Sequence, residues 1–145
     1  MTSFQDSTIT KDQITQVVDL FYDRVQLDQN LSAPFSIVTD WAYHKKIITH
    51  FWWMTLGGDR YMDHKYSVAQ KHRAVGFTPE LLNQHWLPLF EQTIREVLPD
   101  TLSDVWLVQA RRIGRSLELN HNYMVAQSES DKKQVLENTF LEIKR

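Results

Sequence analysis

Residues 10–25 read TKDQITQVVDLFYDRV, and this stretch indicates the kind of fold. Thr10, followed three residues later by Gln13, forms a capping box, which commonly starts a helix. Apolar residues then recur at helical spacing, at Ile14, Val17, Val18, Phe21 and Val25. The pattern predicts an amphipathic helix with Tyr22 at the edge of its buried face, where the phenol hydroxyl needs a partner.

A second helix is predicted to begin after Asp40, a capping residue, and to end at the Gly57-Gly58 pair. Its inward face would carry Trp41, His44, Ile48, Phe51, Trp52 and Thr55. Residues 28–34 interrupt the pattern, and Phe35 stands beyond them as a lone aromatic residue. Residues 57–76 show no clean period, so we expect a loop there with at most one helical turn around His72.

A third helix should open at Thr78-Pro79 and run to about Val97, because a capping residue followed by proline suits the first turn. Pro88 lies inside this helix and should bend it. A fourth helix is predicted through residues 102–117. From residue 120 onward the Ser, Glu, Asp and Lys content suggests a mobile connection, with Ser130 capping a last amphipathic turn or two.

The composition agrees with a helical protein of one domain, residues 1–145. The low counts of glycine and proline, four of each, argue against a β-sandwich or barrel, which needs many tight turns. The absence of cysteine excludes thiolate metal sites, and a formal net charge of -2 gives no reason to expect nucleic acid or an anionic membrane as partner. Residues 1–9 are expected to be disordered and 120–145 to be an extension. The first twenty residues lack a signal-peptide core, so we expect a cytoplasmic protein. A monomer is the default expectation.

The motifs of several enzyme classes are missing. The chain has no Gly-rich phosphate loop, no nucleophile elbow and no H-E-x-x-H pair, so no sequence motif supports a kinase or a hydrolase. Histidines remain as candidates. By spacing alone, His44 is a core histidine on an apolar helix face and His72 is a solvated one, and His50, His64, His85 and His121 are interpreted in the same ordinary way.

The chain's aromatic content, five Trp, five Tyr and seven Phe, allows a more specific hypothesis. An apolar pocket with a few polar tips, and a histidine supplied by another segment, is what a haem requires. The apolar candidates are Phe21, Phe35, Ile48, Phe51, Trp52 and Phe77, and the polar tips are Tyr22, His44 and Trp86. Periodicity alone still favours an ordinary aromatic core over a cofactor site.

Five short pieces of sequence, in order, carry a family resemblance: LFYDRV (20–25), APF (33–35), DWAYH (40–44), HFW (50–52) and WLPLF (86–90). In this order and at these separations they resemble the truncated haemoglobins, most closely those of group 3. The likeness covers about residues 14–117. It implies an all-α, truncated globin-like helical sandwich, with two antiparallel helix pairs around a haem b, iron protoporphyrin IX.

The resemblance also implies roles for single residues. His72 matches the proximal ligand of the iron, fourteen residues before Trp86. Tyr22 matches the ligand-binding tyrosine, His44 a distal histidine that can gate the pocket, and Trp86 a tryptophan that reaches toward bound ligand. Phe35 matches the phenylalanine that packs on the haem, and Ile48 lies one turn beyond His44.

The segment around His72 departs from the family pattern. The family commonly has a Leu-Pro pair after the proximal histidine, whereas this chain reads Arg73-Ala74-Val75-Gly76. His64, eight residues earlier, is therefore kept as the fallback ligand. Arg73 and Lys71 are candidate partners of the haem propionates, although a solvated surface explains them equally well.

The resemblance implies reversible binding of a small diatomic ligand (oxygen, nitric oxide or carbon monoxide) with no dedicated catalytic residue. Two alternatives stay open on the sequence. The pocket could support detoxification of nitric oxide or peroxide, with an unidentified reductase as electron donor. The chain could also be a haem-free, globin-like sensor domain.

Overall fold

The computed structural model describes residues 8–66 and 77–144, and within these ranges all regular structure is helical, as the sequence predicts. Side chains are described through residue 134 and at Leu136. The elements are α2 (Lys11–Leu27), α3 (Ser32–Phe35), α4 (Trp41–Thr55), α6 (Pro79–Leu81), the π-helical turn η1 (Leu82–Trp86), α7 (Leu87–Val97) and α8 (Asp100–Lys144).

The start of α2 confirms the predicted capping box. The Thr10 hydroxyl accepts the Gln13 N–H at 3.1 Å, and the Gln13 side-chain oxygen accepts the Thr10 N–H at 2.9 Å. The predicted apolar positions of α2 are all buried. Ile9, just before the cap, is only 5% exposed, so the prediction that residues 1–9 are disordered is wrong for Ile9. Residues 1–7 lie outside the described residues.

Helix α4 also begins where the sequence predicts. The Asp40 carboxylate accepts the Tyr43 N–H at 3.1 Å, and the helix ends at Thr55, shortly before Gly57 adopts a φ of 101°. Glycine suits that turn because its φ is positive. The sequence did not predict α3, a four-residue helix within and after the expected break. Too short to show a periodic pattern, it brings Phe35 against Tyr22 with ring centroids 5.8 Å apart.

The third predicted helix is present in three joined parts. The Thr78 hydroxyl caps α6 by accepting the Leu81 N–H at 3.1 Å, and α7 ends at Val97. Between α6 and α7 the helix widens into η1, directly before the turn that contains Pro88. Proline has no N–H to donate and crowds the preceding turn, which accounts for the local distortion.

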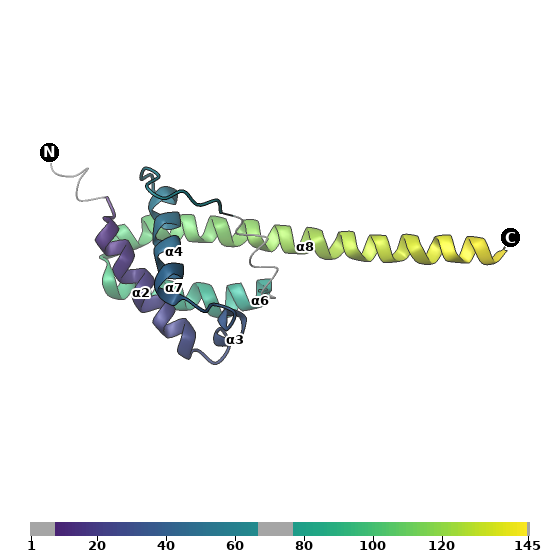
Figure 1. Ribbon diagram of the computed structural model, residues 1–145, viewed down its shortest axis with the longest axis horizontal. Helices are drawn as coiled ribbons and strands as arrows, with labels where there is room; N and C mark the ends of the chain where they lie inside the picture. The colour runs from purple at the N-terminus through teal and green to yellow at the C-terminus, as the bar shows by residue number, and fades with distance from the viewer. Residues whose placement is uncertain (1–7, 67–76, 145) are drawn as a thin grey trace.

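Helix α8 corrects the prediction for the C-terminal part of the chain. It continues without interruption from Asp100 to Lys144, where the composition suggested a mobile connection and a separate last turn. After Gly114 the sequence contains no glycine or proline, and Ser, Asp and Lys each cost a helix little. The second half of α8 extends well away from the rest of the molecule (Figure 1).

The helices assemble around one aromatic cluster. α7 and α8 form an antiparallel pair, while α2 packs against both α4 and α7 (Figure 1). At the centre Trp52 stacks on Phe90 at 5.4 Å, and Trp106 meets both rings edge-on. Phe21 also contacts Phe90, at 4.9 Å. Much of the unusual aromatic content is therefore ordinary core, which buries large apolar faces and holds α2, α4, α7 and α8 together.

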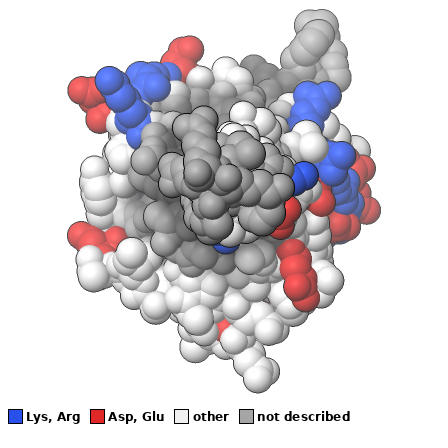
Figure 2. Space-filling view, turned by 90° about the vertical axis from the view of Figure 1, so that its right-hand side faces the viewer, with Lys and Arg blue, Asp and Glu red and all other residues white. Residues whose placement is uncertain are grey.

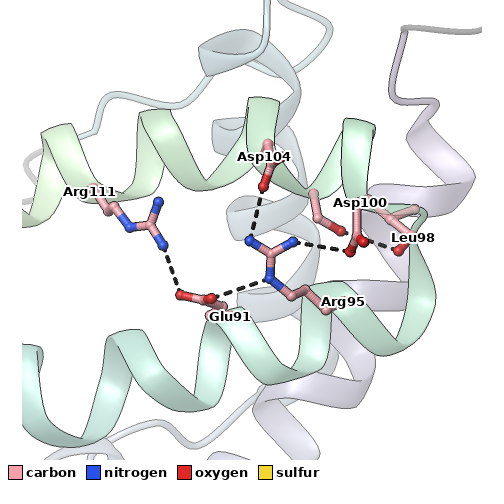
Figure 3. Close-up of polar contacts among 7 residues, drawn as sticks. Glu91, Arg95, Leu98, Asp100, Asp104 and Arg111 are labelled. Carbon is pink, nitrogen blue, oxygen red and sulfur yellow. Dashed lines mark hydrogen bonds and ion pairs between the residues drawn. The ribbon is translucent and has the colours of Figure 1, made fainter.

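A polar network on the surface fixes α7 against α8 (Figure 3). Arg95 on α7 binds Glu91 at 3.2 Å, and reaches Asp100 and Asp104 on α8 at 3.2 and 2.9 Å. Arg111 binds the other oxygen of Glu91 at 2.8 Å. The hydrogen bond from Arg95 is the main reason that the pKa of Glu91 lies below its ordinary value. The contacts join α7 and α8 beyond their short connection.

The outer surface shows no concentration of charge of one sign in the view along α8. Lys and Arg side chains lie among Asp and Glu side chains, and broad areas between them carry neither (Figure 2). Among the described helices, none is both long and apolar enough to cross a membrane.

Candidate functional site

An apolar pocket lies between α2, α3, α4, η1 and α8. Seven of its lining residues belong to the set predicted from sequence: Tyr22, Phe35, His44, Ile48, Phe51, Trp52 and Trp86. These residues come from segments far apart in the chain, and the fold brings them to one cavity. The described lining encloses about 130 Å³ and reaches Tyr66, the last described residue before segment 67–76.

The three polar side chains predicted from the sequence, those of Tyr22, His44 and Trp86, all line the pocket. Tyr22 is 5% exposed, and its ring centroid lies 6.3 Å from that of His44. Burial raises the pKa of the Tyr22 phenol, and the nearby Trp86 indole partly offsets this rise. The Trp86 Nε1 is itself buried and, among residues 8–66 and 77–144, has no acceptor in hydrogen-bonding geometry. A buried donor without a partner costs free energy, so this N–H is available to a ligand in the pocket.

Phe21 and Phe77, which were predicted to line a cofactor pocket, are not in the described lining. Phe21 is fully buried behind it and meets both Tyr22 and Trp86 edge-on, at 4.8 and 5.2 Å. Phe77 is 6% exposed and packs against Phe35 at 6.0 Å. Both rings therefore support the lining side chains from behind.

The predicted metal ligand cannot be placed. His72 and Arg73, together with Lys71, lie outside the described residues, so their roles stay predictions. His64, the fallback ligand, is described but does not line the pocket. Its ring packs on Tyr66 at 4.7 Å, and its Nε2 is buried without a described partner. Across residues 8–66 and 77–144, no group of three or more His, Cys, Asp or Glu could hold a metal ion.

Seven lining residues were not predicted: Ile47, Tyr66, Leu82, Ala110, Ile113, Gly114 and Leu117. Leu82, Ile113 and Leu117 fall within the predicted third and fourth helices, but their place at the pocket was not predicted. Tyr66 lies in a segment without periodicity, and nothing in the sequence indicated it. The contribution of α8 to the pocket is a consequence of how it pairs with α7.

The arrangement suits a flat apolar group with a small polar ligand at one face. Aromatic and aliphatic side chains supply the apolar walls, and they exclude water from the interior. The phenol of Tyr22, the indole N–H of Trp86 and the imidazole of His44 provide hydrogen bonding at one place. In such a dry environment each hydrogen bond is stronger than it would be in water.

Comparisons with known proteins agree with this geometry. The chain is 28% identical to a group 3 truncated hemoglobin from Campylobacter jejuni over 111 residues, which is 73% of this chain and 86% of that protein. The crystal structure of a group III truncated hemoglobin from Campylobacter jejuni superimposes with a TM-score of 0.69 at 28% identity, covering 77% of this chain and 90% of that one. No protein-family model matches the chain. Sequence and fold thus show the same similarity.

Proposed function

We propose that this chain, which is similar in sequence and fold to the group 3 truncated hemoglobins, is a globin-type haem protein that reversibly binds oxygen or a similar diatomic ligand. One observation carries the proposal. Among the residues that the structure describes, the buried Trp86 indole N–H has no acceptor, and it lines a largely apolar pocket together with Tyr22 and His44. A donor in that position suits a small ligand that carries partial negative charge.

The residues present fit iron protoporphyrin IX in chemistry. Phe35, Ile48 and Phe51 would pack on the faces and edges of the macrocycle. A porphyrin is larger than the roughly 130 Å³ that the described lining encloses, and residues 67–76, which follow the lining residue Tyr66 in the chain, lie outside the described residues. That segment contains His72, the proposed iron ligand, and Arg73, the proposed propionate partner. When bound, the haem would supply an iron atom that can bind a diatomic ligand.

Tyr22 and Trp86 would hold the ligand by donating hydrogen bonds to it. Each such bond contributes on the order of 1 kcal/mol, and mainly slows escape of the ligand. Because burial keeps the pKa of Tyr22 above its ordinary value, its phenol retains the proton that it donates. The Phe21 ring, packed edge-on against both residues, fixes their positions.

His44 would control access to the same place. It is half-buried at the edge of the pocket, between Trp41 and Tyr22. Rotation of its side chain toward solvent would open a path, and rotation inward would cover the ligand position. This proposal gives His44 a gating role and assigns hydrogen bonding chiefly to Tyr22 and Trp86.

The experiment is reconstitution with hemin, followed by absorption spectra of the wild type, His72→Ala and His64→Ala. We expect a Soret band in the wild type, a changed ferrous spectrum or loss of haem in His72→Ala, and little change in His64→Ala. A colourless wild-type protein would remove the haem proposal and leave the haem-free sensor. The opposite order of effects would transfer the ligand role to His64.

Stopped-flow mixing with nitric oxide and peroxide tests the enzymatic alternative. Rates no faster than those of an ordinary ligand-binding globin would leave reversible binding as the function. The reductase, the monomeric state and the cytoplasmic location stay predictions.

A further inference from the structure

A short segment without regular structure runs back along α4 and borders the pocket. We call residues 58–66 the strap. At its start the Trp53 ring covers Gly58 so closely that a Cβ there would lie 2.1 Å from the ring. The Trp53 indole N–H also donates to the Asp59 carbonyl at 3.0 Å. This end of the strap therefore requires glycine and is tied to the last turns of α4.

His50 holds the middle of the strap. It is fully buried, at 0% exposure, and its Nε2 lies 3.1 Å from the Tyr61 amide nitrogen and 3.3 Å from that of Met62. Both backbone groups are donors, so Nε2 must be the unprotonated, accepting nitrogen of the ring. The strap thus depends on one lone pair of a buried imidazole.

Tyr66 completes the same network and assigns the proton. Its hydroxyl donates to the Ile47 carbonyl at 3.0 Å, which uses its only hydrogen. The His50 Nδ1 lies 2.6 Å from the same oxygen, so Nδ1 must carry a hydrogen and donate it. Only the neutral imidazole with its proton on Nδ1 satisfies every contact, because a charged ring would place an N–H against two other N–H groups.

The surroundings of His50 agree with a neutral ring. Burial lowers its pKa, and Arg60, His64 and Lys11 lower it further. Lys11 reaches from α2 over the rings of Trp53 and Tyr61, at 5.1 and 4.2 Å. The other titratable groups against the ring are the phenols of Tyr61 and Tyr66, both with raised pKa values. Among the described residues, no carboxylate contributes to the shift in the pKa of His50.

The network ends at the pocket. The Tyr66 ring lines it and packs against Phe51, with centroids 5.4 Å apart. We propose that His50 is a positioning residue, whose neutral imidazole fixes the strap on α4 and thereby holds the Tyr66 ring in the pocket wall. The consequence of this role for haem binding rests on the proposed function.

The first test uses nitrogen NMR on the wild-type chain and needs no variant. Imidazole ¹⁵N shifts at neutral pH should show His50 protonated at Nδ1 and unprotonated at Nε2. The opposite tautomer, or a charged ring, would overturn the assignment.

Variants then test the positioning role. His50→Phe keeps a flat ring without polar atoms, whereas His50→Gln keeps an oxygen that can accept from Tyr61 and Met62. We expect amide exchange at these two residues to rise at least tenfold in the Phe variant and to stay near wild type in the Gln variant. Nuclear Overhauser contacts between Tyr66 and Phe51 should weaken only in the Phe variant. His121→Phe, at a half-buried position on α8, is the matched control and should change neither measurement.

Haem loss is measured separately, by transfer of hemin to an acceptor apoglobin. His50→Phe and Tyr66→Phe should both lose hemin at least fivefold faster than wild type. Unchanged exchange and unchanged Tyr66 contacts in His50→Phe would overturn the proposal, with or without haem. If His50→Phe does not fold, Tyr66→Phe serves instead: it removes the two hydrogen bonds of the Tyr66 hydroxyl, to His50 and to the Ile47 carbonyl. Unchanged Tyr61 exchange with unchanged hemin loss in this variant would count against the proposal. A wild type that binds no hemin would defeat the proposed function, while the NMR measurements would still decide the role of His50.

Discussion

Helix α4 carries two histidines six residues apart, and the structure places them in opposite circumstances. His44 is half-buried beside Tyr22 at the mouth of the pocket. His50 lies on another side of α4, because six residues turn an α-helix by about 240°. It is fully buried, and both of its ring nitrogens have hydrogen-bond partners.

The difference shows that a histidine on a helix has no fixed meaning. A ring whose nitrogens are both engaged by the protein is held in one tautomer and one orientation. A ring at a cavity edge can rotate and respond to a ligand. Sequence spacing gave both histidines the same ordinary interpretation, and only their neighbours separate them.

Removing each imidazole should expose this contrast most strongly. His50→Leu leaves the Tyr61 and Met62 amides without their acceptor and removes one of the two hydrogen bonds of the Tyr66 hydroxyl, so we expect a loss of about 3 kcal/mol in the free energy of unfolding. His44→Leu should cost under about 1 kcal/mol, because its position is partly solvated. Urea unfolding followed by circular dichroism measures both. Equal losses would contradict the contrast.

Ligand release should show the reverse order of importance. Tyr22→Phe removes one buried donor at the pocket, worth about 1 kcal/mol or slightly more, so release of oxygen should become about 5 to 10 times faster. Stopped-flow ligand replacement on the reconstituted protein measures this rate. Tyr43→Phe, at an exposed position on α4, is the control and should leave the rate unchanged. A Tyr22→Phe rate equal to wild type would deny the donor role.

Acid should act on the buried histidine in a predictable direction. The pKa of His50 is lowered in the folded protein, so below about pH 6.5 the unfolded chain takes up a proton that the folded chain does not. The stability that depends on its neutral ring is therefore complete above that pH and is lost as the pH falls through the folded-state pKa. Urea unfolding of wild type and His50→Gln at pH values from about 7.5 down to about 5 measures this change in the free energy of unfolding. Parallel pH profiles would contradict this account.

The smallest effect is expected at the exposed network between α7 and α8. Glu91→Gln weakens its contacts with Arg95 and Arg111, but all three side chains are partly solvated. We expect a slight decrease in melting temperature at low ionic strength, and less at high salt because salt screens exposed charges. Glu118→Gln, which breaks a contact within α8, is the control. A large decrease that does not depend on salt would show that these exposed contacts stabilise the fold as strongly as the buried contacts of His50.

Much of the site could be predicted from the sequence, and its gaps have physical causes. Tyr22, His44 and Trp86 were identified because they match a spaced pattern on helices, and helices keep such spacing. Tyr66 was not identified, and neither was the attachment of the strap to α4. The strap has no periodic pattern, and its order comes from contacts with Trp53 and His50. His72 stays a prediction, since it lies outside the described residues.

The sequence by itself determined the helices with clear caps and apolar stripes, because these depend on neighbours three or four residues away. It misjudged residues 120–130 of α8, where polar composition was interpreted as a mobile connection although no residue interrupts the helix. Tertiary structure alone decided which aromatic rings became core and which became pocket, and which histidine is locked in place. Those outcomes depend on contacts between segments distant in the chain, such as Phe21 with Phe90 and His50 with Tyr61, which local periodicity does not specify.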